Sequence, residues 1–487
     1  MRAFLQAVID YIFGVRFTFE RWICAAAAAF ALFFSDARAS AADTLLWNTN
    51  QNQVTADIHS VPLTRLLAGI AHHTGWQVFL EPNINPPVSV KFQDLKTGEA
   101  LRMLLGNLNF AIVPQTNGPT HLYVFRTARA RATRMIRPED LISKAAKSGK
   151  IPNELVVTVK PGVKIDGIDC IQNAKVTGQI QGLNVYRVQF QDEAAAQAAQ
   201  SCLSGNPDVL AVESNYSMEP PDLPVGVGNA SPQFNLTPRP GDDNNCQVIV
   251  GLVDTSVGDL GSSLDQFLMK PLSVAGDGSA NAPAPSSDAT SADQITHGTA
   301  MAETILQGLQ ANTGGNTSVK ILPVNVYGSS GESTSTFDVT SGIYQAVNAG
   351  ANVINLSLAG SGDSTVMHNL IQQATKQGVI FFGAAGNTPV TTPEYPAAYP
   401  EVQAVTASAG QGQIADYANR GSFVDLMLPG TSIVPFDGQS WAVSGTSTAT
   451  AYATGIAAGL ADSSHNCPTT VIPTLQKKFG VSLGGSQ

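Results

Sequence analysis

The C-terminal half of the chain alternates between apolar runs and amphipathic helical patterns. Residues 248–253 form an unbroken apolar run, which is typical of a strand buried on both faces of a parallel sheet. Farther along the chain, residues 341–349 and 366–376 supply crossover helices. Strands that alternate with helices in this way predict an α/β fold, a doubly wound parallel sheet whose functional groups gather at the carboxyl ends of its strands.

Three polar residues stand where this pattern begins or ends an element. Asp254 closes the first apolar run. His297 opens a helix whose apolar positions are Met301, Ile305 and Leu309. Ser447 precedes a helix whose narrow apolar face is formed by Ala453, Ile456, Ala457 and Leu460. Taken singly, each residue has a plain structural interpretation as a turn cap, a helix-start histidine or an N-cap serine.

Together these residue types have a definite chemistry. A serine hydroxyl is a weak nucleophile until a neutral imidazole accepts its proton, and a carboxylate holds that imidazole in the required tautomer. A helix N-terminus also favours negative charge that develops near Ser447. No Gly-x-Ser-x-Gly segment surrounds Ser447, so an esterase of the α/β-hydrolase kind is disfavoured.

In its motifs the chain resembles the subtilase family of serine endopeptidases, whose catalytic residues follow the order Asp, His, Ser. Residues 250–256, 297–299 and 445–447 resemble the aspartate, histidine and serine motifs, and residues 382–387 resemble the segment that presents the oxyanion-hole asparagine. Two departures bear on rate and cleft geometry. Ala451 stands where the family usually has a proline, and the aspartate motif lacks the usual His-Pro continuation.

The resemblance implies a subtilisin-like peptidase domain over residues 246–487. Ser447 would attack the peptide carbonyl, His297 would act as base and then acid, and Asp254 would orient His297. The Asn387 side chain and the Ser447 backbone N–H would bind the oxyanion. The substrate backbone would pair as an added strand with Ser357, Leu358, Ala359 and Gly360. That stretch has no acidic cluster, so small or apolar substrate side chains are expected rather than basic ones.

Residues 1–39 have the features of a secretory signal peptide. Arg2, Arg16 and Arg21 precede an apolar stretch at residues 22–34, and residues 37–39 offer a small-x-small cleavage site. The apolar stretch is too short to span a bilayer. The alternative is a retained signal anchor that also uses the residues nearer the N-terminus. We therefore predict an exported protein, periplasmic or secreted, with no membrane span in the mature chain.

Residues 43–126 are predicted to form a β-α-β-β-α-β module. Its strands are expected at residues 54–58, 76–80, 88–92 and 121–125, with two leucine-rich amphipathic helices between them. This order resembles the short N-terminal (STN) domain shared by secretins and TonB-dependent receptors, which implies an interaction domain for a periplasmic or outer-membrane protein. The alternative is a small α+β domain of unknown partner. His72 and His73 are interpreted as a solvated pair, because no ligands at suitable spacing accompany them.

Three further segments lead to the peptidase domain. Residues 127–150 are predicted to be a basic, solvated linker. Residues 151–219 resemble the inhibitory propeptide domain of subtilases, most clearly at residues 208–216. Such a domain covers the cleft and places its C-terminal tail in the active site, so that the zymogen cuts itself; the alternative is a permanent α+β spacer. Residues 220–245 are rich in Pro, Gly and Asn and are predicted to be a linker open to processing.

Composition sets limits on partners and compartment. The 487 residues suffice for two or three domains, and a net charge of −10 does not indicate a nucleic-acid partner. Of the five cysteines, Cys24 lies in the signal peptide. The others are expected to pair as Cys170 with Cys202 and Cys246 with Cys467, although three connectivities are possible and buried free thiols are the competing interpretation. Pairing would place the protein in an oxidising compartment.

The sequence therefore predicts an exported serine endopeptidase, made as a self-processed zymogen, that acts on polypeptide substrates. Two small α+β domains precede its α/β peptidase domain. No cofactor is required and no metal ligands are assigned; calcium is common in the resembled family, but no ligand set is evident. The alternative hypothesis is a periplasmic binding or sensing protein in which the protease fold is slow or silent and residues 43–126 carry the function. Ala451 is the main feature that favours this alternative.

Overall fold

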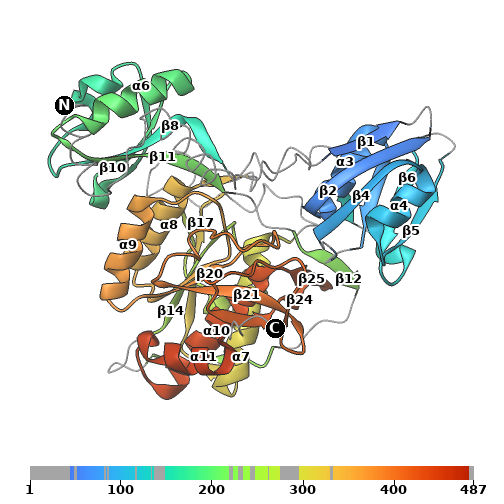
Figure 1. Ribbon diagram of the computed structural model, residues 1–487. Coiled ribbons are helices and arrows are strands. Elements are labelled where there is room, and N and C mark those ends of the chain that lie inside the picture. Colours follow the sequence, from blue (N-terminus) through green and yellow to red (C-terminus); the bar gives the residue numbers. More distant parts are fainter. Residues whose placement is uncertain are drawn as a thin grey trace, which may run out of the picture.

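A computed structural model describes three folded units (Figure 1). The described residues are 44–48, 52–81, 84, 87–115, 118–132, 134–136, 149–218, 223–228, 234–241, 247–261, 263–274, 295–328 and 333–481. The signal peptide predicted for residues 1–39 lies outside these ranges. Within them, no helix has both the length and the apolar character needed to cross a membrane.

The C-terminal unit, which covers the predicted peptidase domain and is called the peptidase unit below, is built on a mostly parallel sheet. Its strands are β14 (Ile249–Asp254), β15 (Leu272–Ser273), β17 (Lys320–Asn325), β19 (Val353–Leu356), β20 (Ile380–Ala384), β21 (Val402–Gly410), β22 (Gln413–Ile414) and β23 (Leu426–Pro429). They are ordered β15-β17-β14-β19-β20-β21-β22, with β23 also paired to β21, and only β22 is antiparallel. The chain proceeds from β14 to β17 on one side and later to β19 on the other, so β14 lies at the switch point of the sheet. The predicted α/β fold class is confirmed.

Helices cover both faces of this sheet (Figure 1). Helices α8 (Thr336–Asn348) and α9 (Thr365–Lys376) pack on one face. Helices α7 (His297–Thr313), α10 (Thr446–Ser464) and α11 (Ile472–Phe479) pack on the other. Helices α7 and α10 approach very closely, because a Cβ at Gly455 would collide with the Ile305 carbonyl oxygen. This contact fixes the relative position of the two helices that begin at His297 and at Thr446.

A second unit packs against the peptidase unit. Its strands β8 (Lys150–Val159), β9 (Lys175–Ile180), β10 (Val185–Gln189) and β11 (Val209–Met218) form one sheet, covered by α6 (Glu193–Ser204). The end of β11 pairs with β18 (Thr334–Ser335), which belongs to the peptidase unit. The predicted disulfide between Cys170 and Cys202 is present. The other predicted pair involves Cys246, which lies outside the described residues.

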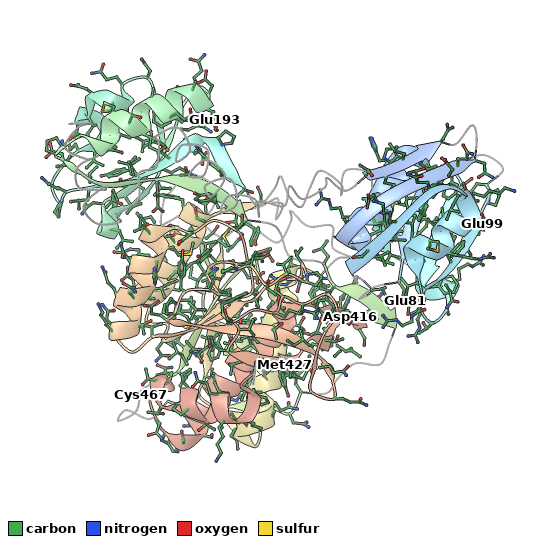
Figure 2. All side chains as sticks on the ribbon, in the orientation of Figure 1. Glu81, Glu99, Glu193, Asp416, Met427 and Cys467 are labelled. Atoms are coloured by element: carbon green, nitrogen blue, oxygen red, sulfur yellow. A yellow bond between two sulfur atoms is a disulfide. The ribbon has the colours of Figure 1, made fainter. Side chains whose placement is uncertain are left out.

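The N-terminal unit contains two sheets and two helices. One sheet is β1 (Thr44–Asn48), β2 (Gln53–Pro62) and β4 (Pro87–Lys96); the other is β5 (Asn109–Val113), β6 (His121–Phe125), β3 (Gln77–Leu80) and β7 (Arg134–Ile136). Helices α3 (Leu63–Thr74) and α4 (Thr97–Leu105) cover the core. Strands β1, β5 and β7 were not predicted. An ion pair of 3.6 Å between Arg126 and Asp416 joins this unit to the peptidase unit near the labelled Asp416 in Figure 2.

Both predicted linkers are partly structured. Arg134–Ile136 of the predicted basic linker pairs with β3, and Ile136 is buried. In the predicted linker 220–245, β12 (Val225–Gly228) pairs with β25 (Gln439–Ser444), and β13 (Thr237–Pro238) pairs with β16 (Asn316–Thr317). The linker assignments were too broad because strand pairing uses backbone groups and does not require an apolar pattern.

Candidate active site

Asp254 lies at the carboxyl end of β14, where the apolar strand brings its side chain to the switch point of the sheet. The residue is only 1% exposed. Its Oδ1 accepts hydrogen bonds from the Thr255 backbone N–H (2.7 Å) and from His297 Nδ1 (2.8 Å). The sequence separates Asp254 and His297 by 43 residues, and the fold brings them into direct contact.

His297 is the first residue of α7 and is buried. Thr296 caps the helix by accepting from the Thr299 N–H, and its hydroxyl donates to the Ser256 carbonyl (2.7 Å). Since a carboxylate only accepts, the His297 nitrogen that faces Asp254 carries the proton. In the neutral imidazole, Nε2 therefore has a free lone pair and can accept a proton.

Ser447 lies in the first turn of α10, directly after the strand β25. Gly445, the N-cap, has a φ of +154°, a conformation that side-chain-bearing residues rarely adopt. The Ser447 hydroxyl donates to the Ser357 carbonyl oxygen (3.0 Å). A hydroxyl has one proton, so in this arrangement it is not donating to His297. Catalytic hydrogen bonds often form only when substrate is bound, so this geometry is compatible with a nucleophile at rest.

Asn387 follows β20 and contacts the residue before Ser447. Its Oδ1 accepts from the Thr446 N–H (2.8 Å) and from the Thr446 hydroxyl (3.0 Å). A backbone N–H can only donate, so the amide oxygen must face Thr446 and Nδ2 is left as a donor. Nδ2 lies beside Gly445, where a Cβ would be 3.1 Å from it. The arrangement therefore offers a side-chain donor beside the start of α10.

The predicted substrate strand is only partly available for pairing. Ser357 and Leu358 are buried, and Ala359 is half-buried. Gly360 already forms an antiparallel pair with Tyr395: each backbone N–H donates to the other's carbonyl (2.9 and 2.8 Å). The expectation that Gly360 presents free backbone groups to a substrate is therefore not met, because Tyr395, distant in sequence, occupies them.

Sequence reasoning missed a buried acid on α7. Glu303 is 1% exposed, and within the described residues neither of its carboxylate oxygens has a hydrogen-bond partner. Burial alone raises the pKa of Glu303 to about 8. Glu303 lies one helical turn after Thr299 and one turn before Gln307, so the three share a side of α7. On this side, Gln307 donates to the Ile433 carbonyl of β24 (Thr431–Phe436). Glu303 is therefore protonated and neutral up to about pH 8, whereas an ordinary carboxyl group, with a pKa of 4.5, is charged there.

We expect Glu303 to make stability fall as pH rises. The unfolded chain loses the Glu303 proton near the ordinary carboxyl pKa of 4.5, whereas the folded chain keeps it up to about pH 8. Between these values the free energy of unfolding should decrease by about 1.4 kcal/mol per pH unit, and then level off. Glu303→Gln should remove this slope in denaturant unfolding of a Ser447→Ala background. Glu99→Gln, a change at an exposed acid on α4 (Figure 2), should leave the slope in place. A Glu303→Gln protein with the original slope would contradict the assignment.

The predicted role of Asn387 as an oxyanion donor implies that Asn387→Ala lowers the turnover number by about 100- to 1000-fold, the effect of losing one prearranged donor. In subtilisin, the protein on which this range was measured, the corresponding asparagine has that effect. KM should change little, since the donor acts on charge that develops only in the transition state. Steady-state hydrolysis of a protein substrate would measure both constants. Equal turnover of the variant and the original protein would exclude Asn387 from this role.

Comparison with known proteins assigns the C-terminal part of the chain to one family. The sequence profile described as "Subtilase family" matches residues 246–471. Subtilisin Savinase from Lederbergia lenta is 31% identical over 194 residues, which are 39% of this chain and 72% of that protein. A Thermophilic serine proteinase from Bacillus sp. (strain AK1) is 35% identical over 163 residues, 33% of this chain and 39% of that protein.

A solved structure of fervidolysin from Fervidobacterium pennivorans, a keratinolytic enzyme related to subtilisin, aligns with a TM-score of 0.49 at 22% identity. The alignment covers 64% of this chain and 55% of that one.

Proposed function

Because the chain belongs to the subtilase family, we propose that it is a serine endopeptidase that hydrolyses peptide bonds through an acyl-enzyme on Ser447. The observation that carries the proposal is the buried 2.8 Å hydrogen bond between Asp254 Oδ1 and His297 Nδ1. This bond fixes the tautomer in which His297 Nε2 can accept the Ser447 proton.

The residues can be assigned successive roles. On binding of a peptide, the Ser447 hydroxyl exchanges its bond to the Ser357 carbonyl for one to His297 Nε2. Attack on the peptide carbonyl forms a tetrahedral oxyanion, which Asn387 Nδ2 and the Ser447 N–H stabilise. His297 then gives the proton to the leaving amine, and water releases the acyl group by the reverse sequence. The Asp254 carboxylate holds the imidazole in place and stabilises the imidazolium that forms.

A fluorophosphonate tests the proposal directly, because it reacts with activated serine nucleophiles. We expect the purified chain to gain one probe mass, to carry it on the peptide that contains Ser447, and to lose hydrolysis of denatured casein in proportion. The silent binding protein, the alternative function, predicts neither labelling nor hydrolysis. An enzyme that cleaves esters but not casein would indicate a different serine hydrolase.

We also propose that residues 151–219 act as the inhibitory propeptide of this enzyme. Two of its side chains cap helices of the peptidase unit. Glu213 accepts from the Ser364 hydroxyl (2.5 Å) and the Thr365 N–H (2.9 Å) at the start of α9. Asn215 Oδ1 accepts from the Phe337 N–H (3.1 Å) at the start of α8. Helix N-termini have unpaired N–H groups and a positive dipole end, so both contacts stabilise docking.

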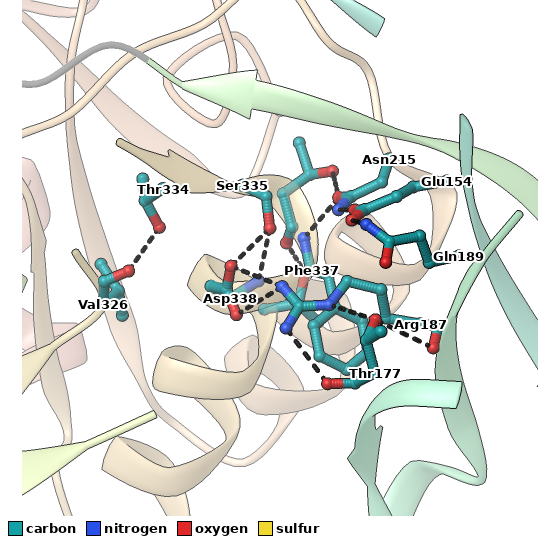
Figure 3. Close-up of polar contacts among 12 residues, drawn as sticks. Glu154, Thr177, Arg187, Gln189, Asn215, Val326, Thr334, Ser335, Phe337 and Asp338 are labelled. Atoms are coloured by element: carbon teal, nitrogen blue, oxygen red, sulfur yellow. Dashed lines mark hydrogen bonds and ion pairs between the residues drawn. The ribbon is translucent and has the colours of Figure 1, made fainter. Parts of the chain in front are cut away.

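A buried ion pair strengthens the same interface (Figure 3). The Arg187 guanidinium donates from Nη1 to both carboxylate oxygens of Asp338 (3.1 and 2.9 Å), and both side chains are largely buried. Burial raises the pKa of Asp338, although the neighbouring Arg187 charge opposes that shift. Losing one partner would leave the other charge buried and unpaired, which is strongly destabilising. These contacts support the proposal that the propeptide-like unit docks on the peptidase unit in one defined position.

Glu213→Ala should weaken docking by about 10- to 100-fold, the effect of losing hydrogen bonds to a charged group. The measurable result is a shorter lag between self-processing and the appearance of activity on casein. Glu193→Ala on α6, an exposed acid labelled in Figure 2, is the matched control and should leave the lag unchanged. An unchanged lag in Glu213→Ala would count against an inhibitory role for this unit.

We further propose that the protein is exported, and that residues 43–126 bind a periplasmic or outer-membrane protein. The Cys170–Cys202 disulfide supports an oxidising compartment. Cell fractionation of the tagged full chain, with residues 1–39 present or deleted, tests export. Retention of both forms in the cytoplasm would contradict the proposed route.

A further inference from the structure

A series of buried hydrogen bonds connects β19 to the first turn of α10. Thr454 Oγ1 lies 2.9 Å from Asn355 Oδ1 and 2.9 Å from the Thr450 carbonyl oxygen, so these two acceptors share its proton. Asn355 Nδ2 donates to Ser357 Oγ (2.9 Å). Ser357 Oγ in turn donates to the Ser447 carbonyl oxygen (3.0 Å). The Thr454, Asn355 and Ser357 side chains are fully buried. We call Thr454, Asn355 and Ser357 the relay.

The Ser447 carbonyl, the last acceptor of the relay, fixes the direction of the bonds that Ser357 and Asn355 donate. The Ser447 carbonyl can only accept, so the Ser357 hydroxyl must give it its single proton. The Ser357 oxygen can then only accept from Asn355, which requires the amide NH₂ to face Ser357. The Asn355 amide oxygen is thereby left to accept from Thr454. By donating to the Ser357 oxygen, the Asn355 NH₂ group leaves the Ser357 proton free for the Ser447 carbonyl.

Ser357 holds the nucleophile at two points. Its hydroxyl donates to the Ser447 carbonyl, and its own carbonyl accepts from the Ser447 hydroxyl (3.0 Å). Asn355 lies in the centre of the sheet and pairs with Leu252 of β14, two residues before Asp254. The relay therefore ties the turn that carries Ser447 to the strands that carry the carboxylate.

We propose that Asn355 and Ser357 are positioning residues for the nucleophile: the relay sets the place and resting orientation of Ser447 relative to Asp254 and His297. The inference rests on the proposed role of Ser447 as nucleophile. Neither side chain is assigned a contact with the substrate. Both act on Ser447, and a small misplacement of a nucleophile is costly to the chemical step, about 100-fold for 1 Å.

The test measures fluorophosphonate labelling of the purified full chain, resolved into the limiting rate constant kinact and the binding constant KI. Ser357→Ala should lower kinact by about 10- to 100-fold and change KI by less than about threefold. Asn355→Asp keeps the side-chain shape but removes the NH₂ donor, so it should lower kinact as well. Since relay members act as a unit, Asn355→Ala combined with Ser357→Ala should be little worse than Ser357→Ala alone.

Thr450→Val is the matched control. Thr450 lies on the same helix and is fully buried, and its hydroxyl donates to the Thr446 carbonyl (2.7 Å) rather than to a relay side chain. The backbone carbonyl that Thr450 offers to Thr454 is unchanged in the valine variant. It should keep kinact within about threefold of the original. The inference is overturned if Ser357→Ala and Asn355→Asp label at the original rate, if the two alanine effects multiply, or if Thr450→Val loses as much. Thermal unfolding confirms that each protein is folded. If Asn355→Ala does not fold, the kinact of Asn355→Asp tests the role of Asn355. An original protein that is not labelled refutes the proposed function itself.

Discussion

Ser447→Ala is expected to lower peptide hydrolysis by on the order of a million-fold, the loss measured on removal of the nucleophile in subtilisin. Alanine has no hydroxyl, so only the oxyanion donors and substrate binding would remain to supply a residual rate. The same change should abolish self-processing, because the cut in the proposed zymogen would use the same hydroxyl. Self-processing is therefore an all-or-none assay that needs no knowledge of the substrate.

The measurement is intact mass of residues 40–487 expressed in an oxidising compartment. The original chain should lose its N-terminal part through a cut between Pro220 and Cys246, and Ser447→Ala should stay whole. Thr450→Val, which removes a different hydroxyl from the same helix, should process normally. A Ser447→Ala chain that is still cut at the same bond would assign the cut to another protease, and uncut chains in both would favour the silent binding protein.

Asp254→Asn should lower turnover by about 10,000-fold, the loss known for the same Asp-to-Asn change in a chymotrypsin-like protease. The asparagine side chain fits the same space, but its NH₂ group can face His297 and donate to Nδ1. The imidazole proton then moves to Nε2, which becomes a donor and can no longer accept from Ser447. The loss therefore arises from the tautomer of His297, with the fold unchanged.

Turnover on casein and thermal unfolding measured together would show this. Asp254→Asn should unfold near the original temperature yet be nearly inactive, whereas Asp416→Asn, a change at an exposed acid, should alter neither (Figure 2). A variant that retains more than about a tenth of the activity would mean that Asp254 does not orient the base.

The elements that carry the candidate active site were predictable because their signals are local. The apolar run before Asp254 specifies a buried strand, and the cap before His297 and the glycine before Ser447 specify helix starts. The contact between Asp254 and His297 follows from chain order and strand ends once the sheet is recognised. Periodicity placed the three residues at strand and helix ends, and the resemblance to subtilases, with their Asp, His, Ser order, grouped them into one site.

The features that escaped prediction depend on partners far along the chain. Tyr395 occupies the backbone of Gly360 from 35 residues away, and nothing near Gly360 signals it. Strands β7 and β12 pair through backbone groups in segments whose composition is typical of linkers. Glu303 was missed because a charged residue is ordinarily placed on the exposed side of a helix, and only the packed structure shows that its side is covered.

Under the proposed self-processing, the pairing of β12 with β25 distinguishes between two positions for the new N-terminus. A cut upstream of Val225 leaves this strand attached to the hairpin that runs into Gly445, so the shortened chain begins with an anchored segment. A cut downstream would strip an outer strand from that hairpin and expose its edge to other chains. Maturation at the upstream position would therefore protect the enzyme from digestion by its own copies, because its new end is held in a sheet from the moment it is made.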